Sequence, residues 1–371
     1  MTGFAFAYAV VRVCGGQPRK NPGAPSYLIN GNNSMMLTHS IKELIKRSTK
    51  YIKACNFLFQ DKEIIELLQQ ACDRGVAVFI ISNIRLSEYS EDDEKKEEST
   101  NTTLPNLNAL KEIGCHVHLL TELHAKFVIC DGMQGILMSA NFSANSLDKN
   151  TETGIPIFGA ELSDLEYVFE KLYLSSDITD IDKTSERNVL LKKTRPLKLD
   201  KDNHLSSNMR FTIASEHKDN NLYNCRIISI YNTIVGIINK AQKYVYIVTW
   251  HFKNLEQLPE LKEAIEKAIK RGVNVVIYSN YYGKGSLSLN ASRKAIDELK
   301  HMGCRNYGDD NNHSKCVISE NDGILFTANI DGKSGMHNGF EAGCKLSREQ
   351  ISLAYQHINK LIEISKKERY E

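Results

Sequence analysis

The sequence predicts an α/β protein built from two similar lobes that share one functional site. Three observations support this expectation. The length of 371 residues is enough for two domains of ordinary size. Segments of the first half recur in the same order about 190 residues further along the chain. Each copy alternates strand-like and helix-like hydrophobic periods, so each lobe is expected to form a mixed, largely parallel sheet flanked by helices.

Three pairs of matching segments define the internal duplication. KYIKACNFLF from Lys50 matches KYVYIVTWHF from Lys243, and RGVAVFIISN from Arg74 matches RGVNVVIYSN from Arg271. LKEIGCHV and LKHMGCRN form the third pair, and the order is the same in both halves. Duplication explains this better than coincidence. The expected organisation is an N-terminal segment at 1–30, a first lobe at 31–175, a linker at 176–225 and a second lobe at 226–371.

A run of strand-forming residues over 51–59 opens the βαβ unit expected in the first copy. It is followed by a helix over 62–73, whose apolar residues fall on one stripe, and by a buried strand over 76–82. An acidic insertion at 88–100 has no such period and is expected to form a surface excursion. The second copy repeats the unit, with the expected strand, helix and strand at 245–249, 258–270 and 273–279.

The overall composition excludes several protein classes. A hydrophobic content of 42% and a charged content of 25% are those of an ordinary globular protein, which rules out collagen-like, coiled-coil and wholly disordered chains. The net charge of +2 argues against a protein that coats polyanions, although it leaves room for a local basic groove. Composition alone therefore names no partner.

Cysteine usage and the N-terminal residues indicate a cytoplasmic protein. The nine cysteines are odd in number, form no C-x-x-C pair and lie mostly in apolar runs, which is typical of buried free thiols in a reducing compartment. The apolar run from Phe4 to Val13 is interrupted by Arg12, is too short to span a bilayer and lacks the features of a signal peptide. We therefore expect a cytoplasmic protein with no integral membrane segment.

The residues with the clearest chemical potential lie near the end of each copy. The first copy reads HAKFVICDGMQGILMSAN and the second reads HSKCVISENDGILFTAN. His124 and Lys126 are two residues apart in a strand-like run, so both side chains point to the same face of the strand. The same holds for His313 and Lys315. Each copy is therefore expected to present a histidine and a lysine side by side.

A hairpin is expected directly after each of these runs. Asp131-Gly132 in the first copy and Asp322-Gly323 in the second have the turn chemistry that reverses a chain. Each hairpin brings one asparagine, Asn141 or Asn329, beside the histidine and lysine of its copy. The return strands are expected at 136–139 and 324–327.

This pattern suits phosphodiester chemistry. Histidine acts at neutral pH as a nucleophile or proton donor, and lysine and asparagine can hold the non-bridging oxygens of a phosphate. Two sets related by a pseudo-two-fold axis would place one histidine on each side of a phosphodiester. Glu152 and Glu341, at matched positions, can each accept a hydrogen bond from an imidazole Nδ1–H and so turn Nε2 toward the phosphate.

Preservation of the hairpins for packing alone is the alternative explanation. It does not account for the retention of histidine, lysine, asparagine and glutamate in both copies while apolar neighbours change, as at Phe127 and Cys316. A functional interpretation is therefore favoured.

At these residues the sequence resembles the phospholipase D superfamily, whose signature is H-x-K-x4-D followed by G-S-x-N and a later glutamate. His124, Lys126 and Asp131 match the first part of the signature, and Ser139 and Asn141 match the second, with Met138 where the signature has glycine. The resemblance covers most of both halves of the chain.

The second copy matches the signature less closely. Its histidine and lysine are present, Glu320 stands at the spacing of the aspartate, and Thr327 and Asn329 stand for the serine and asparagine. In the superfamily this aspartate is mainly a structural support, so the resemblance gives that role to Glu320, or to Asp322 in its stead.

The resemblance also implies a mechanism. It implies one active site shared between two α/β lobes of a single chain, so that a monomer is sufficient. A covalent phosphohistidine intermediate is expected, with no metal or other cofactor. The resemblance favours His124 as the nucleophile and His313 as the acid, and the symmetry of the two copies also permits the reverse. The resemblance also implies catalytic roles for a further set of residues, Lys126, Lys315, Asn141, Asn329, Glu152 and Glu341.

The superfamily includes phospholipases, phospholipid synthases, nucleases and DNA-end-processing phosphodiesterases. The lack of a membrane span or amphipathic lipid-binding helix counts against a lipid synthase, and a cytoplasmic setting offers nucleic acid as the abundant phosphodiester. A metal-independent nuclease on DNA or RNA is therefore expected. A soluble phospholipase D or transphosphatidylase acting on phospholipid headgroups is the first alternative, and a catalytically weak nucleic-acid-binding relative is the second. Candidate substrate contacts are Phe57, Trp250, His251, Tyr282 and Lys284.

Overall fold

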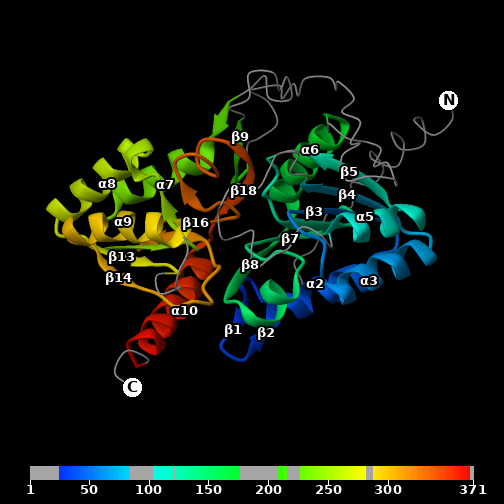
Figure 1. Ribbon diagram of the computed structural model, residues 1–371, viewed down its shortest axis with the longest axis horizontal. Helices are drawn as coiled ribbons and strands as arrows, with labels where there is room; N and C mark the ends of the chain where they lie inside the picture. The colour runs from blue at the N-terminus through cyan, green and yellow to red at the C-terminus, as the bar shows by residue number, and fades with distance from the viewer. Residues whose placement is uncertain are drawn as a thin grey trace.

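The computed structural model describes residues 25–83, 103–120, 122–175, 207–214, 226–280 and 287–367. These residues form two lobes that lie side by side, each with an eight-stranded sheet flanked by helices (Figure 1). The predicted α/β architecture with two duplicated lobes is therefore confirmed. The insertion predicted at 88–100 lies outside the described residues.

No helix within the described ranges is long and apolar enough to cross a membrane.

The order of elements is similar in the two lobes. The first lobe contains β1 (Leu28–Gly31), β2 (Ser34–Met35), α2 (Met36–Arg47), β3 (Tyr51–Asn56), α3 (Lys62–Asp73), β4 (Ala77–Asn83), α5 (Thr103–Glu112), β5 (His116–Leu120), β6 (Phe127–Cys130), β7 (Gln134–Met138), the π-helix η2 (Asn145–Lys149), β8 (Glu152–Ile157) and α6 (Gly159–Ser175). The second contains β9 (Met209–Ala214), β10 (Ile227–Ile228), α7 (Ser229–Lys240), β11 (Tyr244–Val248), β12 (Phe252–Lys253), the 3₁₀-helix η3 (Leu255–Gln257), α8 (Pro259–Lys270), β13 (Asn274–Tyr278), α9 (Leu287–His301), β14 (Arg305–Tyr307), β15 (Cys316–Ser319), β16 (Gly323–Phe326), β17 (Ile330–Asp331), β18 (Gly339–Lys345) and α10 (Arg348–Lys367).

Both eight-stranded sheets have the same pattern of strands. The order is β2-β1-β8-β7-β6-β3-β4-β5 in the first sheet and β10-β9-β18-β16-β15-β11-β13-β14 in the second. Within these two sheets the parallel pairs are those among β3, β4 and β5 and among their counterparts β11, β13 and β14; a separate parallel pair is formed by β12 and β17. The prediction of a mixed sheet is confirmed, but that of a largely parallel one is wrong. Hairpins and return strands supply the antiparallel remainder.

Local signals explain where the helices of the βαβ units begin and end. α3 begins after Asp61, whose side chain accepts a hydrogen bond from the Ile64 amide at 2.9 Å. Gly75 follows α3 and Gly272 follows α8, and both have the positive φ of a helix C-cap, 82° and 83°. The helix predicted over 62–73 matches α3 residue for residue.

Two strands lie, or begin, outside the predicted bounds of the lobes. β9 falls inside the predicted linker at 176–225, yet it is the strand between β10 and β18 in the second sheet. β1 begins at Leu28, inside the predicted N-terminal segment at 1–30, and pairs with β8. Each strand thus extends its sheet beyond the predicted bounds of its lobe, because its partner strands lie far away in the sequence.

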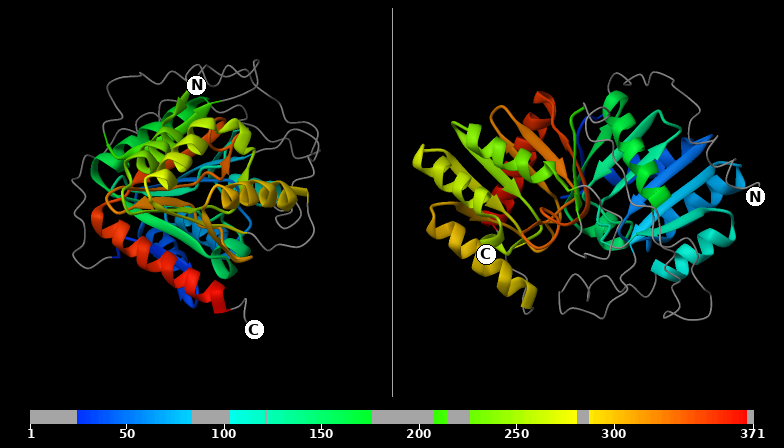
Figure 2. Two further views of the ribbon diagram at one scale, coloured as in Figure 1. Left: turned by 90° about the vertical axis from the view of Figure 1, so that its left-hand side faces the viewer. Right: turned by 90° about the horizontal axis from the view of Figure 1, so that it is seen from above.

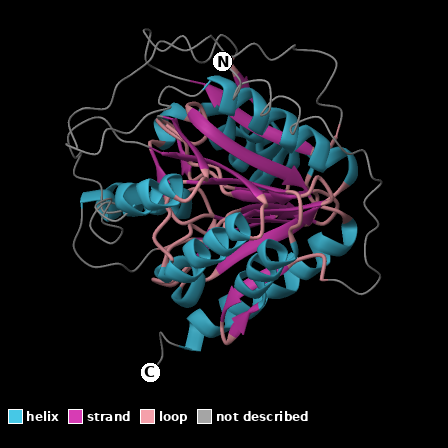
Figure 3. Cartoon of the chain, turned by 90° about the vertical axis from the view of Figure 1, so that its right-hand side faces the viewer, coloured by secondary structure: helices cyan, strands magenta, loops and turns pink. Residues whose placement is uncertain are grey.

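The two lobes share a continuous core and main-chain hydrogen bonds. One cluster of buried apolar residues draws its members from both lobes. The amides of His124 and Ala125 both donate to the Phe340 carbonyl at 3.0 Å, and the His313 amide donates to the Thr151 carbonyl at 3.0 Å. Figure 2 shows the lobes side by side from above, and Figure 3 shows the strands running through the middle with helices around them. Residues of both lobes can therefore build one site.

Candidate active site

Each lobe places its histidine and lysine at the same point of its sheet. His124 and Lys126 lie between β5 and β6, and His313 and Lys315 lie between β14 and β15. Both lysines are fully buried. The Nζ atom of Lys126 donates to the His124 carbonyl at 2.6 Å, and that of Lys315 donates to the His313 carbonyl at 2.8 Å. The structure therefore brings each predicted pair together with matching contacts.

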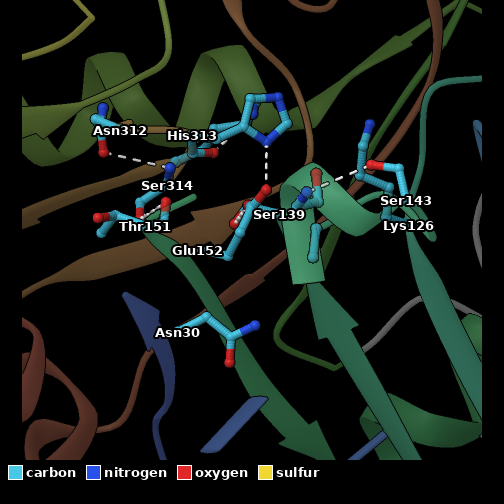
Figure 4. A network of polar contacts seen from close by, with 12 residues as sticks. Asn30, Lys126, Ser139, Ser143, Thr151, Glu152, Asn312, His313 and Ser314 are labelled. Atoms are coloured by element: carbon cyan, nitrogen blue, oxygen red, sulfur yellow. Dashed lines mark hydrogen bonds and ion pairs between the residues drawn. The ribbon is translucent and has the colours of Figure 1, made fainter. Parts of the chain in front are cut away.

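The two glutamates cross between the lobes. His124 Nδ1 lies 2.7 Å from Glu341 Oε1, and His313 Nδ1 lies 2.7 Å from Glu152 Oε1 (Figure 4 shows the second pair). Both carboxylates are buried. The predicted contact between glutamate and imidazole is present, and its partner comes from the opposite lobe. Neither histidine is therefore oriented without the other half of the chain.

A hydroxyl residue holds the second oxygen of each glutamate. Ser139 Oγ donates to Glu152 Oε2, and Thr327 Oγ1 donates to Glu341 Oε2. Each hydroxyl oxygen also accepts a main-chain amide of β8 or β18, from Thr153 at 2.9 Å and from Ala342 at 3.0 Å. Both oxygens of each carboxylate are thereby engaged, which fixes the carboxylate plane facing the imidazole.

Asp131 lies away from the histidines and supports the hairpin. Its carboxylate accepts hydrogen bonds from the main-chain amides of Thr49, Lys50 and Tyr51 at 2.8–3.0 Å and from the Ser48 hydroxyl at 2.9 Å. Burial raises the pKa of Asp131, but these hydrogen bonds outweigh burial and hold the pKa below its ordinary value. The side chain therefore ties the β6–β7 turn to the start of β3.

Glu320 does the same in the second lobe. Its carboxylate accepts the amides of Gln242 and Tyr244 at 2.7 and 3.4 Å. Burial raises the pKa of Glu320, but main-chain hydrogen bonds lower it further, so the net direction is again downward. Asp322 instead faces Lys345 at 3.7 Å. Of the two candidates for the aspartate position, Glu320 occupies it in the structure.

We expect Asp131→Asn to lower the free energy of unfolding at pH 7 by about 1–2 kcal/mol, because an amide cannot accept all of these hydrogen bonds. Since the folded pKa of Asp131 is depressed, its stabilisation is present above the unfolded pKa and is lost as pH falls below about 4. The difference between variant and wild type should therefore shrink in acid. Denaturant unfolding at pH 7 and pH 3.5 measures it, with Asp322→Asn as the matched control. An equal loss in both variants would contradict the assignment.

Asn141 and Asn329 are buried at the ends of β7 and β16. Each follows its hydroxyl residue by two positions, so the two copies keep the same spacing. The residue that sequence reasoning missed here is Asn56, at the end of β3. Its Oδ1 accepts the amides of Leu58 and Phe142 at 3.2 Å, which holds the segment after Asn141 against β3. The sequence signal that could have identified Asn56 is a polar residue at the end of a buried strand.

An aromatic ring flanks each histidine. Phe57 meets His124 edge-on with ring centroids 5.2 Å apart, and Trp250 meets His313 edge-on at 5.7 Å. His251 is buried, and its ring centroid lies 4.6 Å from that of Trp250. Of the predicted substrate contacts, Phe57 and Trp250 therefore lie against the two histidines, and His251 lies against Trp250. Tyr282 and Lys284 lie outside the described residues.

Charges from both lobes act on His313. Burial lowers the pKa of this imidazole, Glu152 raises it, and Lys315 and Lys126 lower it, with a net downward direction. Burial raises the pKa of Glu152, but His313 and Lys315 outweigh burial and keep the carboxyl ionised. Lys126 belongs to the first lobe, so the two sets of residues are close enough for their charges to interact. The ionised Glu152 carboxylate is thus placed to accept Nδ1–H from His313.

Two α/β lobes with a histidine, a lysine and a crossing glutamate from each define the class of phospholipase D-like phosphodiesterases and transferases. The family model described as "Cardiolipin synthase, PLD-like domain" matches residues 41–173 and 234–362, which is more than half of the chain, so this protein belongs to that family. The two matched ranges correspond to the two lobes. No curated protein matches the sequence.

Solved structures share the fold at low identity. Phosphatidylserine synthase from Haemophilus influenzae Rd KW20 has a TM-score of 0.59 at 13% identity, over 96% of this chain and 89% of its own. Polyphosphate kinase from Porphyromonas gingivalis has a TM-score of 0.53 at 13% identity; 93% of this chain matches 53% of that one, so the present chain spans about half of its length. Nuc from Salmonella typhimurium, a phospholipase D family member, matches 40% of this chain and 89% of its own at 19% identity and a TM-score of 0.32.

Proposed function

We propose that the protein hydrolyses phosphodiesters of nucleic acid through a phosphohistidine intermediate. The observation that carries the proposal is the pair of imidazoles whose Nδ1 atoms are held by glutamates of the opposite lobes, each beside a buried lysine. With Nδ1–H bonded to carboxylate, Nε2 is the ring nitrogen left to act on substrate. Two such rings supply the nucleophile and the acid that phosphodiester cleavage needs.

In the proposed reaction His124 Nε2 attacks phosphorus, and a phosphorus–nitrogen bond forms as the bond to the leaving oxygen breaks. His313, which enters this step with a proton on each ring nitrogen, gives its Nε2 proton to that oxygen and keeps Nδ1–H bonded to Glu152. Water then attacks the phosphohistidine, His313 takes the proton from water, and the phosphorus–nitrogen bond breaks. Lys126 and Lys315 stabilise the negative charge of the phosphoryl group in both steps. Trapping a phosphorylated peptide by rapid quenching identifies the nucleophile; an adduct on His313 would exchange the two roles.

Metal independence is expected, because the two lysines place positive charge where a metal ion would otherwise act. Turnover should be the same, within about two-fold, after dialysis against EDTA and in the presence of Mg²⁺. Initial rates on a chromogenic phosphodiester measure this directly. Loss of turnover on chelation, restored by Mg²⁺ or Mn²⁺, would contradict the mechanism.

Nucleic acid is the proposed substrate because an aromatic ring stands beside each histidine, where a base next to the scissile phosphate can stack. Phospholipid is the second candidate, favoured by the description of the matching family and by the likeness of the fold to a phosphatidylserine synthase. A nucleic-acid-binding relative with weak turnover is the third reading.

Purified protein offered DNA, RNA and phospholipid vesicles in parallel, in EDTA, decides among them. Cleavage of DNA or RNA, with binding that weakens steeply as salt rises, supports the proposal. Release of headgroups from vesicles, with little dependence on salt, would show that phospholipid is the substrate and would leave the proposed mechanism unchanged. Salt-dependent binding of nucleic acid without cleavage would support the third reading, and the His124→Ala variant serves as the inactive control.

A further inference from the structure

We propose that Asn83 and Asn280 are positioning residues, each of which holds in place the segment that carries one reacting histidine. The inference rests on the proposed function, since it takes His124 and His313 as the reacting groups. The two asparagines end the matched sequences RGVAVFIISN and RGVNVVIYSN. The Ser-Asn pair is thus retained in both copies, and the site described above does not use it.

In the first lobe, Asn83 reaches the residue directly before the histidine. Asn83 is the last residue of β4 and pairs in register with Leu120, the last residue of β5. Its Nδ2 atom donates to the carbonyl of Leu123 at 2.6 Å. Between them Glu122 has a φ of 63°, so the chain turns sharply where β5 ends. The asparagine therefore holds the chain directly after this turn and one residue before His124.

This hydrogen bond ties the segment to its own lobe. The main chain of the segment is bonded to the opposite lobe, because the amides of His124 and Ala125 donate to Phe340 and the Phe340 amide donates to the carbonyl of Glu122. Leu123 is fully buried. Asn83 thus fixes how far the segment reaches across the interface. The His124 ring must keep its 2.7 Å contact with Glu341, which depends on that reach.

The second lobe has a related arrangement, in which the acceptor lies two residues further from the histidine and two more hydrogen bonds are present. Asn280 Nδ2 donates to the carbonyl of Asp310 at 3.0 Å, three residues before His313. Its amide also donates to the carbonyl of Trp250 at 2.9 Å. Asn312, directly before His313, adds a second side-chain bond, from its Nδ2 to the Thr249 carbonyl at 3.0 Å. His313 is therefore held by two asparagines, and His124 should depend more strongly on Asn83 than His313 does on Asn280.

The test replaces each amide by an apolar side chain of similar shape. With bis(p-nitrophenyl) phosphate as a probe that favours neither nucleic acid nor lipid, we expect Asn83→Leu to lower kcat by about 10–100-fold at nearly constant KM, because a misplaced catalytic group costs rate and not binding. Asn280→Leu should lower kcat by less, about 3–10-fold. Asn83→Gln, which keeps the amide, should recover part of the loss.

Asn306→Leu is the matched control. Its side chain makes the same kind of bond, from Nδ2 to the Ile296 carbonyl at 3.3 Å, on β14 and away from the histidines. This variant should lose stability without losing kcat. Rates are compared for the folded fraction, and Asn83→Ala provides a smaller replacement if leucine prevents folding. Wild-type kcat in folded Asn83→Leu or Asn83→Ala would overturn the inference.

A measurement without substrate keeps the two proposals separable. Hydrogen–deuterium exchange of the unliganded protein should be at least about 10-fold faster for the peptide covering 122–126 in Asn83→Leu, and unchanged there in Asn306→Leu. If the wild type does not cleave the probe, the proposed function fails. Hydrogen–deuterium exchange alone then tests whether Asn83 holds the segment in place. Unchanged exchange at 122–126 in the Asn83 variants overturns the positioning role whatever the activity.

Discussion

Replacing either histidine should reduce turnover by about 10³-fold or more while the protein stays folded, because in the proposed reaction one ring attacks phosphorus and the other protonates the leaving oxygen. His124→Ala and His313→Ala should be equally inactive, and combining them should add little, since the two rings act as a unit. Initial rates on DNA, RNA or a chromogenic phosphodiester measure the effect. Near wild-type turnover in His313→Ala would rule out a two-histidine mechanism.

The variants need a check on folding, because removing His313 leaves the buried carboxylate of Glu152 without its partner. His313→Asn keeps a donor for that carboxylate and should fold where alanine fails. His301→Ala is the control: this histidine is exposed at the end of α9, where its Nδ1 lies 2.7 Å from the Asp297 carbonyl. Its turnover should equal that of the wild type.

The glutamates should affect turnover without affecting binding. We expect Glu152→Gln and Glu341→Gln each to lower kcat by about 10²–10⁴-fold at roughly constant KM, because glutamine still accepts the Nδ1 hydrogen bond but carries no charge to stabilise the imidazolium. Steady-state kinetics on both single variants separate this outcome from a peripheral role. A change confined to KM, or no change, would remove the glutamates from the reaction.

The crossed arrangement adds a pH readout to the same variants. The charge of Glu152 raises the pKa of His313, so Glu152→Gln should move the titration of that imidazole to lower pH. Glu341→Gln, which removes a charge from beside His124, should move the His313 titration much less. NMR titration of the histidine rings measures both. If Glu341→Gln had the larger effect on His313, the pairing of residues across the lobes would be wrong.

Most of the fold and of the site could be predicted from the sequence, because the duplication repeats both. A local helical period and the Asp61 cap fix α3, and the turn at Asp131-Gly132 fixes the β6–β7 hairpin. β9 was missed although its residues MRFTIA alternate between apolar and polar, because the run is short and polar residues flank it on both sides. Its pairing with β18 and β10 is what places it in the second sheet.

The sequence also could not predict that each glutamate contacts the histidine of the opposite lobe. In a linear repeat, Glu152 can serve the histidine of its own copy or that of the other, and the spacing is the same in both cases. Only the packing of β8 and β18 across the lobe interface settles the choice. Phe57 and Trp250 show the same limit, because an aromatic residue after a buried strand is as often core as ligand contact, and its neighbours decide.

The exchange of glutamates also bears on how such a chain can have originated. A single copy of the repeat holds a histidine whose carboxylate partner lies on another copy, so one lobe alone would have an unoriented imidazole and an unmatched buried acid. The geometry is that of a two-fold dimer joined into one polypeptide. A half without its partner would therefore leave its imidazole unoriented, and the two halves now differ at matched positions, as at Phe57 opposite Trp250 and Asp131 opposite Glu320.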